Sequence, residues 1–315
     1  MALIYERWLD RKNLDETAWL EARKNGIGGS DAAAVAGLNP YESPLSVYYN
    51  KIGETPDKES TEAMRQGTDF EEYVAQRFTE ATGKKVKRCN YILRSLANPF
   101  MLADVDRLIV GEDALLECKT TLNRDGYTFE GTDFPQYWFC QCMHYFATIG
   151  IKKIYLAVLV FGRGFHIVEL NREDYKEDIA ALIAIESAFW HNHVLKRIPP
   201  EVDGNNATST ALTAIYPKDN GESVDLMGYE KTLERLAQIK REMNTLSAEE
   251  EQCKNEIKAV LGEASTGEYG IYKVSWKYSE RNSLDSKALK AAHPEIYARF
   301  VRTSSARTFT FKEIN

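Results

Sequence analysis

The longest uninterrupted apolar run in this chain, IYLAVLVF at residues 154 to 161, is the feature that most restricts its fold. A run of eight residues falls far short of the roughly 18 that a membrane-spanning helix requires. A strand that is apolar at every position has to be covered on both of its faces. The run therefore predicts an interior strand of a sheet with helices packed on both sides.

The segments around this run predict the rest of the sheet and its helices. Strands are expected at residues 85–94, 100–110, 114–121, 153–161 and 165–171. Helices are expected at residues 15–24, from about residue 30, and at 44–52, 61–83, 135–150 and 172–197. This order is typical of an α/β protein with a mixed (α+β) sheet flanked by helices.

A change in composition at IPPEVDGNNATST predicts a domain boundary, with a core domain over residues 1–200 and a smaller part over 201–315. Beyond it, apolar residues repeat at threes and fours from residue 229 to 260. The repeat fits two helices or one continuous rod, and we expect a helical hairpin packed on itself or on a neighbouring subunit. YGIYKVSWKYS and RTFTFKEI predict a final strand pair, a small closing β element within a basic tail.

Net charge and cysteine content indicate the cellular compartment and the kinds of binding partner to expect. The formal net charge of −7 argues against a uniformly basic surface for nucleic acid, although a locally basic groove remains compatible with it. The five cysteines form no CxxC pair and no zinc-type pattern, which fits a reducing cytoplasm. The first residues lack the basic-then-apolar order of a secretory signal. We therefore expect a cytoplasmic protein with no membrane segment.

The segment DVDRLIVGEDALLECKT carries the candidate catalytic residues. Alternate side chains of a strand share a face, so Glu117 and Lys119 are expected on one side and Cys118 on the other. Asp104 and Asp106 are expected to share a face of the preceding strand. If the two strands form a hairpin, acidic side chains and an amine converge on one face of the sheet.

Such a cluster has two interpretations. Neighbouring carboxylates repel each other unless a cation lies between them, and oxygen ligands suit Mg²⁺ or Mn²⁺. A lysine beside them could stabilise a hydroxide nucleophile or the charge that develops on a phosphate. The alternative is a surface hairpin whose Asp, Glu and Lys make solvated ion pairs of little energetic consequence.

Two further polar residues are expected near this cluster. Glu71 lies on the core-facing side of its helix, where a carboxylate needs a partner such as a metal ion or its water. Glu72 is its rival, but it points toward the flank. Gln141 and His144 share a face of a later helix, and Gln141 could hold a water or a phosphate oxygen. Alternatively, Gln141 and His144 satisfy neighbouring groups, and we expect this for His144.

The stretch EARKNGIGGSD contains a candidate phosphate site. Its glycines supply flexible backbone, and Ser30 and Arg23 add a hydroxyl and a guanidinium beside the free N–H groups of the next helix. The alternative is that the glycines make a tight turn and that Ser30 or Asp31 caps the helix.

Taken in chain order, these motifs resemble those of the PD-(D/E)XK nucleases. The matching residues are Glu71 in GTDFEEYVA, Asp106 in ADVDRLI, Glu117 and Lys119 in LECKT, and Gln141 in YWFCQCMHY. More closely, residues 15 to 195 resemble the YqaJ-type phage recombinases, which are relatives of the lambda exonuclease. RKNGIGGS, with Arg23 and Ser30, is similar to the 5′-phosphate pocket of that family. Val105 stands where the motif usually has proline.

The resemblance implies a restriction-endonuclease-like core and a Mg²⁺-dependent deoxyribonuclease, with Mn²⁺ as a substitute. The implied activity is 5′-to-3′ exonuclease digestion of double-stranded DNA that leaves 3′ overhangs for single-strand-annealing recombination. The implied roles are metal binding by Asp106, Glu117 and the Cys118 carbonyl, and metal binding by Glu71 directly or through water. Lys119 would position or activate the attacking water. Gln141 would support these ligands or face the substrate, and Arg23 and Ser30 would hold the 5′ phosphate.

The resemblance also implies partners. These are double-stranded DNA ends, a phage single-strand annealing protein and two further copies of the chain in a toroidal homotrimer, in the bacterial host cell of a phage or prophage. Two alternatives remain open: an endonuclease or repair nuclease with another end preference, and a non-catalytic protein that binds DNA ends.

Overall fold

The computed structural model describes residues 4–55, 61–303 and 306–313. The chain divides into two compact units, Met1–Tyr216 and Pro217–Asn315. The boundary lies beyond the expected position at residue 200, because α7 (Asn206–Ile215) packs against α3 (Pro44–Lys51) of the first unit. The small side chains on the packed side of α7 are buried, so this segment belongs to the core domain.

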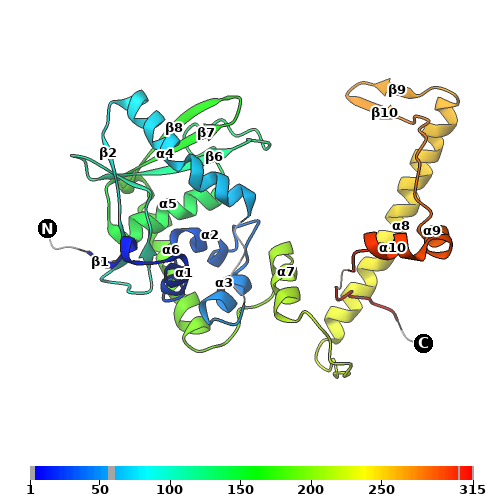
Figure 1. Ribbon diagram of the computed structural model, residues 1–315, viewed down its shortest axis with the longest axis horizontal. Helices are drawn as coiled ribbons and strands as arrows, with labels where there is room; N and C mark the ends of the chain where they lie inside the picture. Colours follow the sequence, from blue (N-terminus) through cyan, green and yellow to red (C-terminus); the bar gives the residue numbers. More distant parts are fainter. Residues whose placement is uncertain (1–3, 56–60, 304–305, 314–315) are drawn as a thin grey trace. The chain divides into compact units, whose positions relative to one another are not determined.

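The first unit is built on a five-stranded sheet with the order β2-β5-β6-β7-β8 (Figure 1). β6 (Ala114–Thr121) and β7 (Lys153–Val160) are parallel neighbours, and α5 (Gln136–Ile149) makes the crossover between them. The other strands run antiparallel to their neighbours; they are β2 (Val86–Arg88), β5 (Arg107–Ile109) and β8 (Gly164–Asn171). The predicted mixed α/β fold is therefore confirmed, and the apolar run supplies its interior strand.

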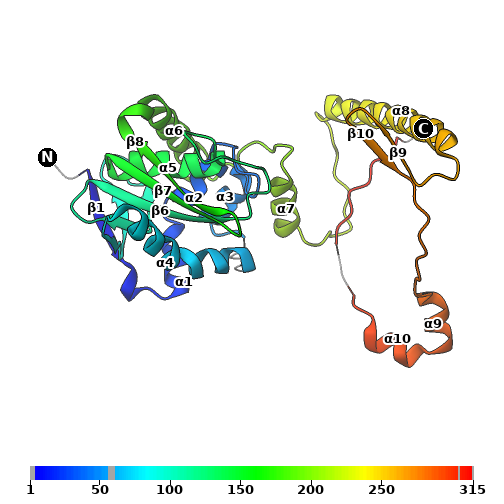
Figure 2. The same ribbon diagram turned by 90° about the horizontal axis from the view of Figure 1, so that it is seen from above.

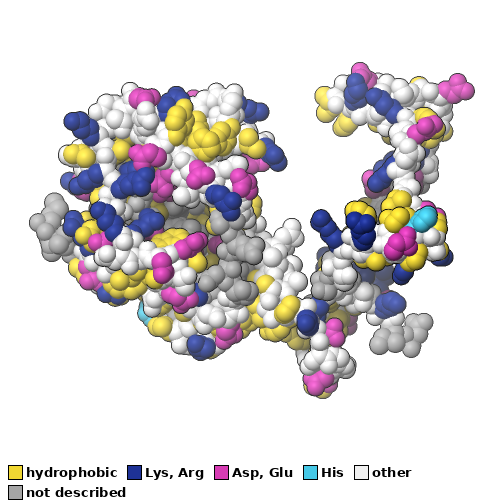
Figure 3. All heavy atoms as spheres, viewed as in Figure 1, with side chains coloured by type: hydrophobic (Ala, Val, Ile, Leu, Met, Phe, Trp, Pro, Cys, Tyr) yellow, Lys and Arg dark blue, Asp and Glu magenta, His cyan; other side chains and the backbone are white. Residues whose placement is uncertain are grey.

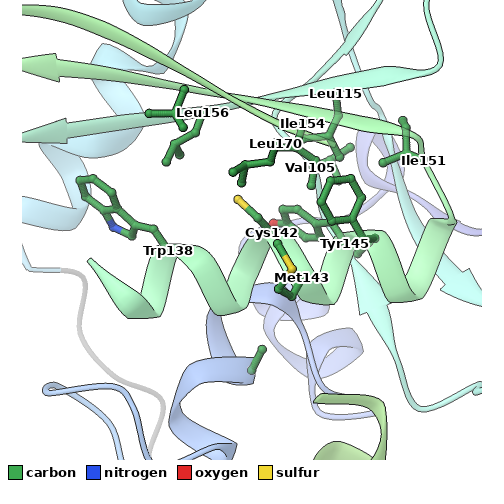
Figure 4. Close-up of a cluster of buried hydrophobic side chains, with 14 of the residues drawn as sticks. Val105, Leu115, Trp138, Cys142, Met143, Tyr145, Ile151, Ile154, Leu156 and Leu170 are labelled. Carbon is green, nitrogen blue, oxygen red and sulfur yellow. The ribbon is translucent and has the colours of Figure 1, made fainter. Parts of the chain in front are cut away.

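Helices cover both faces of this sheet (Figure 2). α4 (Glu62–Thr82) packs Val74 and Phe78 against one face. α5 covers the opposite face, and α6 (Lys176–Phe189) packs on α5 in turn. Figure 4 shows the contact between α5 and the strands, in which Trp138, Cys142 and Tyr145 lie toward Leu115, Ile154, Leu156 and Leu170, whereas Met143 points to the other side of the helix. The burial on both sides explains why β7 carries almost no polar residue.

Residues with known capping roles mark the ends of α4 and α5, the two helices that cover the sheet. Thr61 caps α4 by accepting a hydrogen bond from the Met64 N–H. α4 ends at Gly83 and α5 ends at Gly150, which have φ angles of 71° and 64°. Both glycines therefore take the left-handed conformation that ends helices and that other residues adopt only with strain.

Two of the predicted strands are divided between separate sheets. Residues 85–94 form β2 and β3 (Tyr91–Ser95), and residues 100–110 form β4 (Leu102–Ala103) and β5. β3 and β4 join β1 (Tyr5–Asp10) in a second, three-stranded antiparallel sheet. The strand pairing of residues 5–10 was not expected from the sequence, because its partners only become neighbours in the folded chain.

The remaining elements of the first unit surround these sheets. They are α1 (Glu16–Arg23), α2 (Gly29–Val35), short 3₁₀ turns at Arg11–Asn13 and Arg172–Tyr175, and a π-helical turn at Trp190–Val194. On the face shown in Figure 3, Lys and Arg side chains of this unit lie among Asp and Glu side chains. That face is therefore not uniformly basic, as the formal net charge of −7 leads one to expect.

The second unit corrects the expected helical hairpin. Residues 230–261 form one continuous helix of 32 residues, α8 (Glu230–Leu261), because no Gly or Pro interrupts the segment. A small β element is present, but it is a hairpin of β9 (Thr266–Tyr269) and β10 (Tyr272–Ser275) and not the expected pair of YGIYKVSWKYS with RTFTFKEI. RTFTFKEI forms no strand in its described part, residues 307–313, because β10 already pairs with β9 across a turn at Gly270.

Two short helices complete this unit, α9 (Ser286–Ala292) and α10 (Pro294–Phe300). Much of its apolar surface lies open to solvent. In the described part of the chain, no helix combines the length and the apolar character needed to cross a membrane.

Candidate active site

The break between β4 and β5 positions the first candidate metal ligand. Asp104, Val105 and Asp106 lie in the link between the two sheets, so the expectation that both aspartates share one face of a strand is wrong. The carboxylate of Asp106 accepts a hydrogen bond of 2.8 Å from the Cys118 N–H in β6. Within a strand the N–H and C=O of one residue point to the same edge. The Cys118 carbonyl therefore faces the edge that β5 leaves open, next to Asp106.

Glu117 and Lys119 extend from β6 toward α5, as their alternation predicts. The Lys119 ammonium donates to Glu117 Oε1 at 2.8 Å and to Gln141 Oε1 at 2.7 Å. Gln141 Nε2 donates to the same Glu117 oxygen at 2.7 Å. The other oxygen of Glu117 is buried and has no hydrogen-bond partner. The structure thus joins three of the predicted residues in one network.

The electrostatics of this cluster show an excess of buried negative charge. Burial, followed by repulsion from Glu117 and Glu71, raises the pKa of Asp106 well above its usual value. Burial also raises the pKa of Glu117, although Lys119 opposes the shift. For Lys119 burial alone would lower the pKa, but attraction to Glu117 and Asp106 outweighs it and raises the pKa. Lys119 is therefore a cation at neutral pH.

These features fit a hard divalent cation. An unpartnered buried carboxylate oxygen and a second carboxylate with a raised pKa are both stabilised when a cation lies between them. The donors are all oxygen, which suits Mg²⁺ or Mn²⁺. Among residues 4–55, 61–303 and 306–313, no three His, Cys, Asp or Glu side chains are grouped to hold a metal. The available set is two carboxylates and the Cys118 carbonyl, and Mg²⁺ usually keeps several waters.

Glu71 occupies the opposite side of the sheet from Gln141. It accepts a hydrogen bond from Arg107 Nη1, and Arg107 Nη2 lies 3.1 Å from a Glu72 oxygen. The Arg107 side chain is only 4% exposed and also donates to the Asp106 carbonyl at 2.7 Å. Sequence reasoning missed Arg107. Its position directly after Asp106 could have indicated it, because alternate side chains of a strand point to opposite faces. Arg107 is thereby directed toward the acidic side chains of α4.

A pocket of about 120 Å³ opens beside the carboxylate cluster. Its polar lining residues are Arg23, Gly28, Gly29, Ser30, Asp104, Gln141 and Tyr145. Arg23 Nη2 donates to Ser30 Oγ at 2.6 Å, and the guanidinium lies over the Trp19 ring, 4.8 Å from its centroid. A Cβ at Gly29 would come within 2.7 Å of the Tyr145 ring, so this position requires glycine.

Asp104 lines the pocket, but its carboxylate is already paired with other side chains. Arg11 donates to one of its carboxylate oxygens at 2.8 Å, and the Trp19 indole donates to the other at 3.0 Å. Its backbone carbonyl accepts a hydrogen bond from the Tyr145 hydroxyl at 3.0 Å. Asp104 therefore ties the N-terminal segment and α5 to the link that carries Asp106.

His144 satisfies neighbouring groups, which confirms the structural interpretation given above. Its Nδ1 lies 2.8 Å from a Glu186 oxygen, and its Nε2 lies 2.8 Å from the Leu102 carbonyl oxygen. A carbonyl can only accept, so Nε2 carries a proton. The ring is fully buried, and both of its nitrogens are engaged by these partners.

Comparison with known proteins gives consistent matches. Residues 18–152 match the model of the YqaJ-like viral recombinase domain. The Bacillus subtilis (strain 168) protein YqaJ is 36% identical over 304 residues, which cover 94% of each chain.

Solved structures are more distant. An alkaline exonuclease from Laribacter hongkongensis is 20% identical, with a TM-score of 0.47 over 57% of this chain and 93% of that one. A phage-related exonuclease from Haemophilus somnus 129PT is 10% identical, with a TM-score of 0.41 over 55% of this chain and 96% of that one. On the strength of the full-length similarity to the Bacillus protein and the domain match, this chain belongs to the YqaJ-like viral recombinase family.

Proposed function

We propose that this protein is a Mg²⁺-dependent deoxyribonuclease that digests one strand of double-stranded DNA from its 5′ end and leaves a 3′ overhang for recombination. The observation that carries the proposal is the position of Gln141. This side chain lines the pocket of Arg23 and Ser30, and it also bonds both Glu117 and Lys119. A terminal phosphate held in the pocket would lie next to the cluster, and this arrangement supports cleavage near the strand end.

The metal would be held by Asp106, Glu117 and the Cys118 carbonyl. When bound, Mg²⁺ supplies positive charge for the phosphate and lowers the pKa of a bound water. Gln141 keeps one Glu117 oxygen fixed, and the other, unpartnered oxygen would be available to hold the ion. We propose that Glu71 acts through a water molecule, because Arg107 already occupies one of its oxygens.

Lys119 would act as a cation. Its ammonium is fixed by two side-chain acceptors, and its pKa is raised by Glu117 and Asp106 against the effect of burial. A charged amine cannot accept a proton, so its role is to position the attacking water and to stabilise negative charge on the phosphate. This favours positioning over the role of a general base.

The substrate test compares linear duplexes that carry 5′ phosphate or 5′ hydroxyl ends with covalently closed circles, in Mg²⁺ and in chelator. We expect digestion of phosphorylated linear DNA in Mg²⁺ and no cutting of circles, because a closed circle has no end for the pocket. Products should be short 5′-terminal fragments and a 3′ single strand, resolved on denaturing gels. Cutting of circles would instead support the endonuclease alternative, and tight end binding without cleavage would support the non-catalytic one.

Arg23→Ala should lower the rate of digestion from 5′-phosphorylated ends by about 10- to 100-fold, because a charge-assisted contact to the phosphate is lost. The rate from 5′-hydroxyl ends should change far less. The two rates are measured on duplexes of one sequence that differ only at the 5′ end. Equal slowing on both ends would leave Arg23, Gly28 and Ser30 with the role of a turn and helix cap.

We also propose that the protein works in the cytoplasm of a bacterial host as a toroidal homotrimer and with a single-strand annealing protein. Exposed apolar residues along α8 support contacts between chains, since Met243, Leu246 and Val260 are 60%, 63% and 89% exposed. A ring would also reconcile DNA binding with a net charge of −7, because basic groups need line only its channel.

A further inference from the structure

Lys51 is a buried lysine in contact with the segments that carry Arg23 and Ser30; burial lowers the pKa of its ammonium, and attraction to Asp31 opposes that shift. It is the last residue of α3, and its side chain is only 1% exposed. Its ammonium donates to the Asp31 carboxylate at 2.6 Å and to the Arg23 carbonyl at 3.0 Å. These two acceptors lie on opposite ends of the loop that links α1 to α2. Lys51 therefore holds together the two segments that supply Arg23 and Ser30.

Asp31 competes for the same guanidinium that would bind a phosphate. One of its oxygens accepts from Lys51 and from the Gly28 N–H, the latter at 2.8 Å. Its other oxygen lies 3.9 Å from Arg23 Nη2, so the Arg23 side chain is within reach of an ion pair. Burial would raise the pKa of Asp31, but attraction to Lys51 and then to Arg23 outweighs it and lowers the pKa. Asp31 is thus a carboxylate at neutral pH.

The charges of Lys51 and Asp31 cancel within the pocket region. After Lys51, Arg23 is the cation whose charge acts most strongly on Asp31. A buried carboxylate that loses its partner is strongly destabilised, so the guanidinium would be drawn from Ser30 to Asp31. The pocket would then lose its net positive charge and its forked donor, because the guanidinium would be paired with Asp31.

We propose that Lys51 is a positioning residue for terminal-phosphate recognition: by neutralising Asp31 it keeps the Arg23 guanidinium available to a 5′ phosphate. The inference rests on the proposed function only in taking the Arg23 pocket as the phosphate site. It assigns a role to a residue of α3 that touches neither the phosphate nor the metal ligands. Asp31 would weaken phosphate binding by pairing with Arg23, and Lys51 prevents this by neutralising Asp31.

The test measures binding, so it does not depend on cleavage. Short duplexes with a fluorescent label and either a 5′ phosphate or a 5′ hydroxyl are titrated with the full-length protein in chelator, and anisotropy gives the ratio of the two Kd values. We expect the parent to prefer the phosphorylated end by about 10-fold, and Lys51→Met to reduce this ratio to about one. Asp31→Asn, which keeps an acceptor for the Gly28 N–H, should preserve or increase the preference.

The double variant Lys51→Met with Asp31→Asn separates charge balance from packing. If Lys51 acts by neutralising Asp31, removing both charges restores most of the preference that Lys51→Met loses. Circular dichroism and thermal unfolding show whether each variant is folded. Should Lys51→Met fail to fold, the phosphate preference is still measured for Asp31→Asn and for the double variant, and both should keep most of it. Lys196→Met, which removes an exposed lysine that bonds Asn192, is the matched control and should leave the ratio unchanged.

The outcomes distinguish this inference from the function on which it rests. A phosphate preference that Arg23→Ala abolishes and Lys51→Met leaves intact overturns the role of Lys51 alone. A double variant as poor as folded Lys51→Met also overturns it, because neutralisation of Asp31 would then not be the cause. A parent protein without any phosphate preference overturns both the phosphate pocket and the inference.

Discussion

Lys119→Ala is expected to reduce cleavage of linear duplex DNA by about 10²- to 10³-fold, the range found when a donor that stabilises developing charge is removed. Lys119 supplies the only side-chain ammonium bonded to Glu117 and Gln141 among the described residues, so no neighbour replaces it. DNA binding should be largely kept, because the pocket residues Arg23 and Ser30 are untouched. Single-turnover rates and anisotropy on the same duplex measure the two effects separately.

A matched control is available in the neighbouring strand. Lys153 in β7 also pairs with a glutamate, Glu169, but both side chains are partly exposed. Lys153→Ala should change neither cleavage nor stability measurably, because exposed ion pairs contribute little. Loss of folding in Lys119→Ala, seen as a lost unfolding transition, would show that the lysine is structural and would count against its catalytic role.

Asp106→Asn should abolish detectable cleavage and weaken Mg²⁺ or Mn²⁺ binding by at least about 100-fold. In chelator, however, the same variant should be more stable than the parent. The pKa of Asp106 is raised by burial, Glu117 and Glu71, so the folded protein without metal is destabilised by the ionised side chain. We expect a rise in Tm of about 2–4 °C at neutral pH, on the order of 1 kcal/mol for a domain of this size.

The sign of the pH dependence follows from the same shift. A carboxyl whose pKa is raised by folding contributes stability below its unfolded pKa, here 3.8, and loses it as the pH rises through the folded pKa. Asn cannot ionise, so the Tm advantage of Asp106→Asn in chelator should grow as the pH rises. Added Mg²⁺ should reverse the order, since only the parent gains from the ion.

Asp104→Asn serves as the control for this experiment. Asp104 lies two residues away, but its carboxylate is bound to Arg11 and Trp19. The variant should keep the stabilisation by Mg²⁺ that Asp106→Asn loses. An Asp106→Asn protein that is still stabilised by Mg²⁺ as strongly as the parent would exclude Asp106 from the metal site.

Alternation along β6 was enough to predict the central part of the site. Glu117 and Lys119 share a face because side chains two apart in a strand always do, whatever surrounds them. Helical spacing placed Gln141 and His144 on one face, but in the structure Gln141 bonds Glu117 whereas His144 bonds Glu186. The metal-binding roles came from the resemblance, and they remain proposals that the Asp106→Asn experiment tests.

Other features depend on contacts between segments far apart in the chain. The link between β4 and β5 could not be foreseen, since it arises because β4 pairs with β3 and β5 pairs with β6 in different sheets. Lys51 was missed for the same reason, because nothing near it in the sequence indicates that α3 ends beneath the loop of Arg23 and Asp31. The spacing of apolar residues over residues 230–261 also could not decide between a helical hairpin and one continuous helix.

The sequence by itself determined most helices of the core domain, the layered α/β fold and the types of side chain available for chemistry, because periodicity and turn residues act within a few positions. Only the tertiary structure decided which charges meet. It paired Glu71 with Arg107, Asp106 with the Cys118 N–H and Asp31 with Lys51. The physical reason is that the energy of a buried charge depends on its neighbours in space, and the packing of whole helices and strands selects those neighbours.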